Sequence, residues 1–184
     1  MARGFRRTLT GRFVATFDED ERLLLLDLFE QLSELLAPDV RPDADPLEEL
    51  VGIDPWAEKP DDPAVARLVP DAYNDPEEAD EFRRFTQRGL LDAKSVNART
   101  VCDDLAASGG KVTLSESKAQ VWLTALTDLR LTLATRIGID NDDEPIGSRE
   151  FDPDEPGSEL FAVYDFLSWL QETLVLALMP ELAD

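Results

Sequence analysis

The side chains that most often carry out chemistry in proteins are scarce in this sequence. Its 184 residues include 40 Asp and Glu, 18 Lys and Arg, a single cysteine and no histidine. Histidine proton relays, cysteine-rich zinc sites and paired-thiol switches all need residues that the chain lacks. Because carboxylates are so numerous, no single pair of them points to acid–base catalysis. We therefore expect a protein that is not an enzyme and that needs no cofactor.

The one thiol, Cys102, is the redox candidate. It falls on the predicted packed face of a helix, where burial would raise its pKa and make it inert. If that face is exposed instead, Arg99 would lower the thiol pKa, and Asp103 and Asp104 would oppose it. An intramolecular disulfide cannot form, so redox sensing through a disulfide would have to be intermolecular.

Two segments concentrate basic side chains, one within the first twelve residues and one near residue 85. Their arginines are Arg3, Arg6, Arg7 and Arg12 in the first group and Arg83, Arg84 and Arg88 in the second. Such groups could contact phosphate or an acidic protein surface. Alternatively, they pair with neighbouring acids of the same molecule. Direct DNA binding through the first group predicts an affinity that falls steeply with salt.

The formal net charge of −22 indicates which classes of partner the protein can be expected to bind. A chain this acidic repels nucleic acid and anionic membranes on average, so DNA is disfavoured and a protein partner is expected. A single cysteine fits a reducing cytoplasm, and the N-terminus has no apolar stretch typical of a secretory signal. Residues 160–179 are strongly apolar but contain Asp165, Gln171 and Glu172. We predict a buried central helix there and no membrane span.

The pattern of elements predicts a mainly α protein, a helical bundle with a small N-terminal β-hairpin at 5–17. Asp18 and Glu21 predict a capping box for the first helix. A second helical region runs from Asp75 to about 108, where two glycines stop it, and Phe82 and Phe85 are predicted on its packed face. A third short strand is expected near 112–114, followed by helices at about 115–137 and 158–179. One acidic helical domain over 1–184 is expected, with 38–74 and 139–157 rich in loops.

Several local signals refine this outline. Asp-Pro pairs at 45–46 and 62–63 predict short helices that begin with proline, with partial disorder near 54–62 as the alternative. Gly89 is expected to kink or divide the long helical region. Thr113 and Glu116 predict a second capping box.

Two motifs resemble ligand-binding loops only superficially. The acidic loop has the first spacings of a calcium site at Asp140, Asp142 and Glu144, but proline and phenylalanine replace its required glycine and glutamate. Residues 109–113 lack the first glycine of a phosphate-binding loop and the hydroxyl residue after its lysine. A metal-dependent hydrolase at 140–155 therefore ranks last among the alternatives.

Several segments together resemble one bacterial family over essentially the whole chain. They are RGFRR at 3–7, FVATF at 13–17 followed by DEDERLL at 18–24, DPL at 45–47, DPEEADEFRR at 75–84, WLTALTDLRLTLATRIG at 122–138 and YDFLSWLQ at 164–171. The sequence is similar to the actinobacterial domain-of-unknown-function family whose members are sometimes named oxidative-stress transcriptional regulators.

The resemblance implies a cytoplasmic, non-enzymatic protein that affects transcription under oxidant stress through RNA polymerase or a sigma factor. It also implies a gene neighbourhood shared with a Clp protease adaptor, so an adaptor role in Clp proteolysis is an alternative. Direct operator binding through the N-terminal arginines is another. A homodimer is a further expectation, since three Trp and nine Phe exceed what one small core readily holds.

Overall fold

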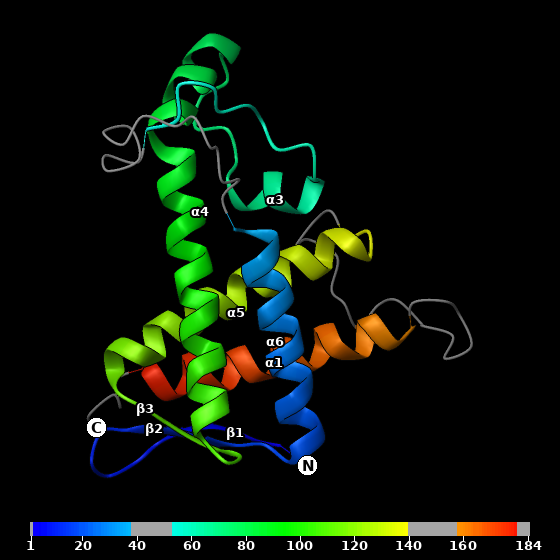
Figure 1. Ribbon diagram of the computed structural model, residues 1–184. Coiled ribbons are helices and arrows are strands. Elements are labelled where there is room, and N and C mark those ends of the chain that lie inside the picture. Colours follow the sequence, from blue (N-terminus) through cyan, green and yellow to red (C-terminus); the bar gives the residue numbers. More distant parts are fainter. Residues whose placement is uncertain (1, 38–52, 140–157, 180–184) are drawn as a thin grey trace.

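The computed structural model describes residues 2–37, 53–139 and 158–179 (Figure 1). The described helices are α1 (Glu19–Leu35), α3 (Pro63–Leu68), α4 (Pro76–Ala107), α5 (Glu116–Arg136) and α6 (Ser158–Leu178), and the strands are β1 (Arg3–Arg7), β2 (Phe13–Thr16) and β3 (Lys111–Leu114). Figure 1 shows α1 and α4 side by side and antiparallel, α5 and α6 crossing behind them, and the sheet closing one end. The mainly α prediction is confirmed, together with the hairpin and the third strand.

The three strands form one antiparallel sheet in the order β1-β2-β3. A bulge interrupts β1 between its pairings with β2 at Arg3 and Arg6. Helix α6 packs on β1, and the Phe5 amide donates a 3.0 Å hydrogen bond to Thr173 Oγ1. A Cβ at Gly4 would lie 2.6 Å from Thr173 Cγ2, closer than any real contact. Glycine at position 4 therefore allows α6 to approach the first strand.

The helix ends follow the predicted capping chemistry with one exception. Asp18 and Glu21 form the expected capping box, and the Asp62-Pro and Asp75-Pro pairs open α3 and α4. The N-cap of α5 is Ser115, whose hydroxyl accepts from the Lys118 amide. The predicted box with Thr113 is wrong because β3 extends to Leu114 and holds Thr113 within the strand. The Asp-Pro pair at 45–46 lies outside the described residues.

Helix α4 runs without interruption through Gly89, so the predicted division is wrong. Its predicted packed face is also wrong at its beginning, where Phe82 and Phe85 are 41% and 56% exposed. Further along, Ser95, Ala98 and Leu105 are buried. The loop before α4 runs back along the helix and packs on the side that carries Arg83. That side is therefore covered, and Phe82 and Phe85 remain exposed.

The core centres on Trp122, which is fully buried where the sheet meets α1 and α5. Its ring makes edge contacts with Phe5 at 5.4 Å and a tilted contact with Phe29 at 6.4 Å between ring centroids. Its indole N–H donates to Asp104 of α4, so the buried polar group is satisfied. One aromatic side chain thus ties together four elements of the fold.

Helix α6 is not the buried central helix that its composition predicts. Only one face is buried, at Tyr164, Leu167, Leu170 and Leu174. By length and apolar composition it is the one helix of the described residues that could cross a membrane. Its inner face lies on α5, where Arg130 donates hydrogen bonds to Tyr164, Ser168 and Gln171 of α6. The prediction fails because α6 packs at the edge of the bundle and leaves apolar residues on its outer side.

Candidate functional site

The N-terminal hairpin carries the first group of arginines on a rigid support. The turn between β1 and β2 is closed by a hydrogen bond from the Thr8 amide to the Arg12 carbonyl at 2.7 Å, and Gly11 adopts a left-handed φ of 73°. The Thr8 hydroxyl accepts from the Arg12 amide at 3.0 Å. These bonds fix the direction in which the turn projects from the sheet.

All four arginines of the hairpin are exposed: Arg3, Arg6, Arg7 and Arg12. No ion pair joins any of their guanidinium groups to another residue in the part of the chain that the structure describes. The alternative that these arginines pair with neighbouring acids finds no support here. They form a positive patch on a strongly acidic molecule.

The tip of the hairpin adds an apolar residue to this patch. Strand β1 stops at Arg7, and Leu9 lies in the turn, fully exposed to solvent. Arg6, Arg7 and Leu9 border one open hollow at the tip. We call Arg6, Arg7, Leu9 and Arg12 the hairpin tip. Exposed arginine beside an exposed large apolar side chain is a composition typical of protein-binding surfaces.

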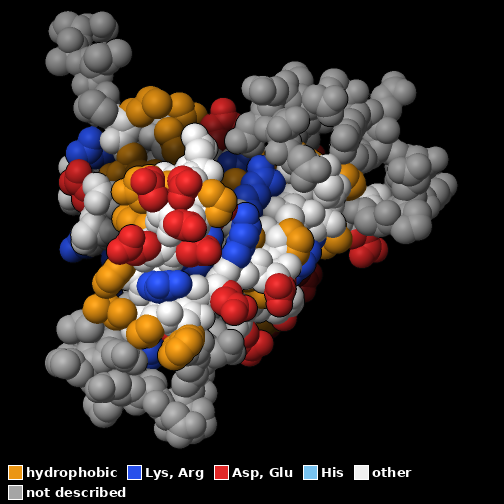
Figure 2. Space-filling model, turned by 90° about the horizontal axis from the view of Figure 1, so that it is seen from above, with side chains coloured by type: hydrophobic (Ala, Val, Ile, Leu, Met, Phe, Trp, Pro, Cys, Tyr) orange, Lys and Arg blue, Asp and Glu red, His pale blue; other side chains and the backbone are white. Residues whose placement is uncertain are grey.

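The second arginine group does not form a common basic surface. Arg83 is only 7% exposed and forms ion pairs with Asp71 and Asp80. Arg84 is exposed, and its backbone oxygen accepts a 2.8 Å hydrogen bond from the Asp54 amide. The view onto the end where α4 begins shows acidic and basic side chains next to one another (Figure 2). The prediction of a second basic contact site is therefore wrong at Arg83, which has a structural role.

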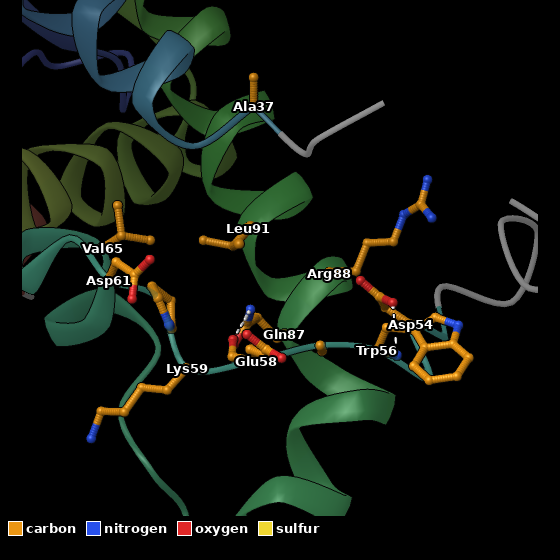
Figure 3. A pocket seen from close by; sticks show the side chains of 12 residues that line it. Ala37, Asp54, Trp56, Glu58, Lys59, Asp61, Val65, Gln87, Arg88 and Leu91 are labelled. Atoms are coloured by element: carbon orange, nitrogen blue, oxygen red, sulfur yellow. Dashed lines mark hydrogen bonds between the residues drawn. The ribbon is translucent and has the colours of Figure 1, made fainter. Parts of the chain in front are cut away.

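Arg88 lines a cleft of about 540 Å³ between α4 and the segment that precedes α3. Trp56, Asp54 and Arg88 lie at one end of the cleft and Lys59 and Asp61 at the other (Figure 3). The lining mixes both signs of charge, which does not favour one class of charged ligand. Within the described ranges, no group of three or more His, Cys, Asp or Glu side chains could hold a metal ion. The acidic loop at 140–157 lies outside them.

The redox candidate Cys102 is half-buried on α4. Burial raises the pKa of the thiol to about 11, and the carboxylates of Glu30 and Asp103 add to the rise. Arg99 does not counter this effect, because it donates hydrogen bonds to Ser33 and Ser95 in the contact between α1 and α4. The environment thus stabilises the thiol form, which is the less reactive one.

Comparison with known proteins shows which family the chain belongs to. A family model described as a domain of unknown function, DUF2017, matches residues 2–178. The chain belongs to this family. Proteins named "Oxidative stress regulator AosR" from Mycobacterium tuberculosis H37Rv and Mycobacterium bovis are 34% identical to it, covering 91% of this chain and 83% of theirs. A Mycobacterium leprae protein named "Putative oxidative stress regulator AosR" is 36% identical over 151 residues, 73% of this chain and 67% of its own. No solved structure matches.

In this DUF2017 chain, sequence reasoning identified the hairpin arginines but missed two exposed apolar residues. Leu9 is one, and Trp56, 74% exposed at the mouth of the cleft, is the other. A signal for Leu9 was present, because Thr8, Thr10 and Gly11 around it favour a turn over a strand. No local signal marks Trp56, whose exposure depends on how the loop returns along α4.

Proposed function

We propose that the chain is a non-enzymatic cytoplasmic regulator of the oxidative-stress response that acts through protein contacts, with RNA polymerase or a sigma factor as its partner. The observation that carries the proposal is the match along most of the chain to proteins named oxidative stress regulators. The names of the relatives indicate a role in the oxidative-stress response. The family resemblance indicates that this role is in transcription.

The hairpin tip supports a mode of action through protein contact. It presents guanidinium groups that form no ion pair with another described residue, together with an exposed leucine. The hydrogen bonds of the turn hold its backbone, so little backbone conformational entropy is lost on binding. The partner surface that complements it is acidic with an apolar pocket. The raised pKa of Cys102 argues that this chain does not itself sense oxidant through a thiolate.

The test is affinity purification of the tagged protein from its own cells after nuclease treatment, with and without oxidant, followed by mass spectrometry. We expect RNA polymerase or a sigma factor to be enriched with the wild type and lost with Arg6→Gln/Arg7→Gln. The matched control is Arg84→Gln/Lys111→Gln, which removes the same charge from exposed positions elsewhere. Enrichment of Clp components alone would replace transcription with proteolysis as the primary role.

Direct DNA binding is a second candidate, favoured by the four exposed hairpin arginines. Here the wild type would bind a labelled duplex of its own promoter region in a fluorescence polarisation assay, with an affinity that falls steeply as salt rises. Arg6→Gln/Arg7→Gln would reduce both the affinity and the salt dependence. Absence of binding at low salt would remove this candidate, and we expect that result because of the net charge of −22.

A further inference from the structure

The outer face of α6 has a regular arrangement that the fold does not use. Apolar and acidic residues alternate along it at steps of three and four positions, all of them exposed: Ala162, Asp165, Trp169, Glu172 and Leu176. Such spacing places them on one side of an α-helix, where they form a straight stripe about 21 Å long. Met179, 56% exposed, continues the stripe by one more step. We call these residues the α6 stripe.

The apolar members of the α6 stripe other than Ala162 are large and exposed to solvent. Leu176 is 60% exposed and Trp169 is 39% exposed. Phe166, at the flank of the stripe, stacks on Trp169 with 6.0 Å between ring centroids. An exposed tryptophan supported by a second aromatic ring is the kind of side chain that dominates binding energy at protein interfaces.

The charges of the stripe are all negative. Helix α6 contains no Lys or Arg, and its acids Glu159, Asp165 and Glu172 are all exposed. None of these three carboxylates forms an ion pair with a residue in the ranges that the structure describes. A complementary surface must therefore supply positive charge next to apolar side chains.

The opposite side of α6 is held in place, so the stripe is presented rigidly. Arg130 of α5 contacts Gln171 at 2.6 Å and Ser168 at 2.9 Å, and its guanidinium lies 5.1 Å from the centre of the Tyr164 ring. Gln171 in turn donates to Thr127 at 2.8 Å. A surface fixed before binding loses less entropy when a partner docks.

We propose that the α6 stripe is a docking site for a basic amphipathic helix of another protein. Spacing of three and four residues is the pattern that a partner helix meets in helix-to-helix packing. Leucine-like side chains of the partner would pack on Trp169 and Leu176, and its Lys or Arg side chains would lie beside Asp165 and Glu172. A second copy of this chain is disfavoured, because it would bring the same acids from both molecules together. An anionic membrane is disfavoured because its lipid headgroups would repel Asp165 and Glu172.

The probe for this site is a fluorescein-labelled synthetic helix of about 18 residues, long enough to cover the stripe, with leucines on one face flanked by lysines. Its counterpart carries glutamates in place of the lysines. Binding to the full chain is followed by fluorescence anisotropy at physiological salt. We expect the lysine peptide to bind and the glutamate peptide not to bind.

Matched variants separate docking on the stripe from general attraction to an acidic protein. Trp169→Ala should weaken binding at least about tenfold, as loss of an interface tryptophan does, whereas Trp56→Ala should not change it. Asp165→Lys/Glu172→Lys should weaken binding further. Asp27→Lys/Glu34→Lys, exposed acids at the same spacing on α1, should retain it. Leu176→Ser is the second stripe variant, and unchanged thermal unfolding of each variant shows that it folds.

The outcomes that overturn the proposal are distinct. If Asp27→Lys/Glu34→Lys weakened peptide binding as much as Asp165→Lys/Glu172→Lys, the attraction would be non-specific. If neither peptide bound, or if both bound equally, the charge complementarity on which the proposal depends would be wrong. Sedimentation showing a dimer that Trp169→Ala dissolves would assign the stripe to a second copy. Trp169-dependent binding to neutral lipid vesicles would assign it to a membrane surface. This proposal and the proposed function have only the need for a protein partner in common. A negative result with the peptide would therefore not change the interpretation of the pull-down with the hairpin variant.

Discussion

The two arginine-rich segments of this chain differ in the burial and ion pairing of their side chains. Arg6 and Arg7 are exposed on the hairpin without an ion pair to another described residue, whereas Arg83 is buried and held by Asp71 and Asp80. The difference comes from what the fold brings near each segment. The hairpin is short and has no acid within it, but the loop before α4 returns Asp71 to the side of the helix that carries Arg83. Local composition therefore cannot distinguish an arginine available to a partner from one that holds the fold.

The strongest test of this comparison is removal of Arg83. Arg83→Ala should lower the free energy of unfolding by about 2–3 kcal/mol, somewhat less than for a fully buried pair because Asp71 and Asp80 are partly exposed. Urea unfolding followed by circular dichroism measures it. Arg84→Ala, on the same helix and exposed, should change stability by no more than about 0.5 kcal/mol. Equal costs at the two positions would show that the contacts of Arg83 are not structural.

Arg99 extends the comparison to Cys102, because its guanidinium is committed to Ser33 and Ser95 and not to the thiol. With a thiol pKa of about 11 against an ordinary value of 9.0, the native protein should contain about a hundredfold less thiolate at neutral pH than the unfolded chain. Iodoacetamide labelling, read by mass spectrometry, should therefore be much slower in the native state than in urea. Equal rates in both states would contradict this environment for Cys102.

The acids that pair with basic residues can be compared through pH. The hydrogen bond from Lys59, and then that from Arg83, lowers the pKa of Asp71 below its ordinary value of 3.8. A lowered folded-state pKa contributes stability above the unfolded pKa, which is lost as pH falls through the folded value. The cost of Asp71→Asn, measured by urea unfolding, should therefore grow as pH rises from about 2 to about 5 and stay constant above that.

Asp128, 3% exposed and 2.6 Å from Lys94, should show the opposite trend. Burial raises its pKa, and the Lys94 ammonium only partly opposes that rise. A raised folded-state pKa contributes stability below the unfolded pKa that is lost as pH rises through the folded value. The cost of Asp128→Asn should therefore shrink as pH rises above the unfolded pKa of 3.8 and through the folded value. Parallel curves for the two variants would contradict the assignment.

The smallest expected effect on stability is at the hairpin. Arg6→Gln/Arg7→Gln should leave the free energy of unfolding within about 0.5 kcal/mol of the wild type, since neither side chain is buried or paired within the described structure. The same variant is the one expected to lose its partner in the pull-down. A large loss of stability would mean that these arginines serve the fold, and the contrast with Arg83 would disappear.

Capping and periodicity were sufficient to predict most elements of this fold. The Asp18 capping box and the Asp-Pro helix starts depend on neighbours within one turn, so they can be recognised from sequence. The errors at Phe82 and in α6 concern which side of a helix meets the rest of the molecule. That choice depends on contacts between distant segments, such as Asp71 with Arg83 and Arg130 with Gln171. Composition gave the character of these helices but not their orientation.

The contact between Gly4 and Thr173 has a consequence for how the protein is made. During synthesis β1 leaves the ribosome well before the helix that covers its outer edge, because α6 follows all other described elements in the chain. Until α6 emerges, that edge presents unpaired backbone groups and the Phe5 side chain lacks part of its cover, a combination that favours aggregation. The nascent hairpin is thus open to aggregation until α6 is made, and truncation before α6 should leave a chain that accumulates as insoluble protein.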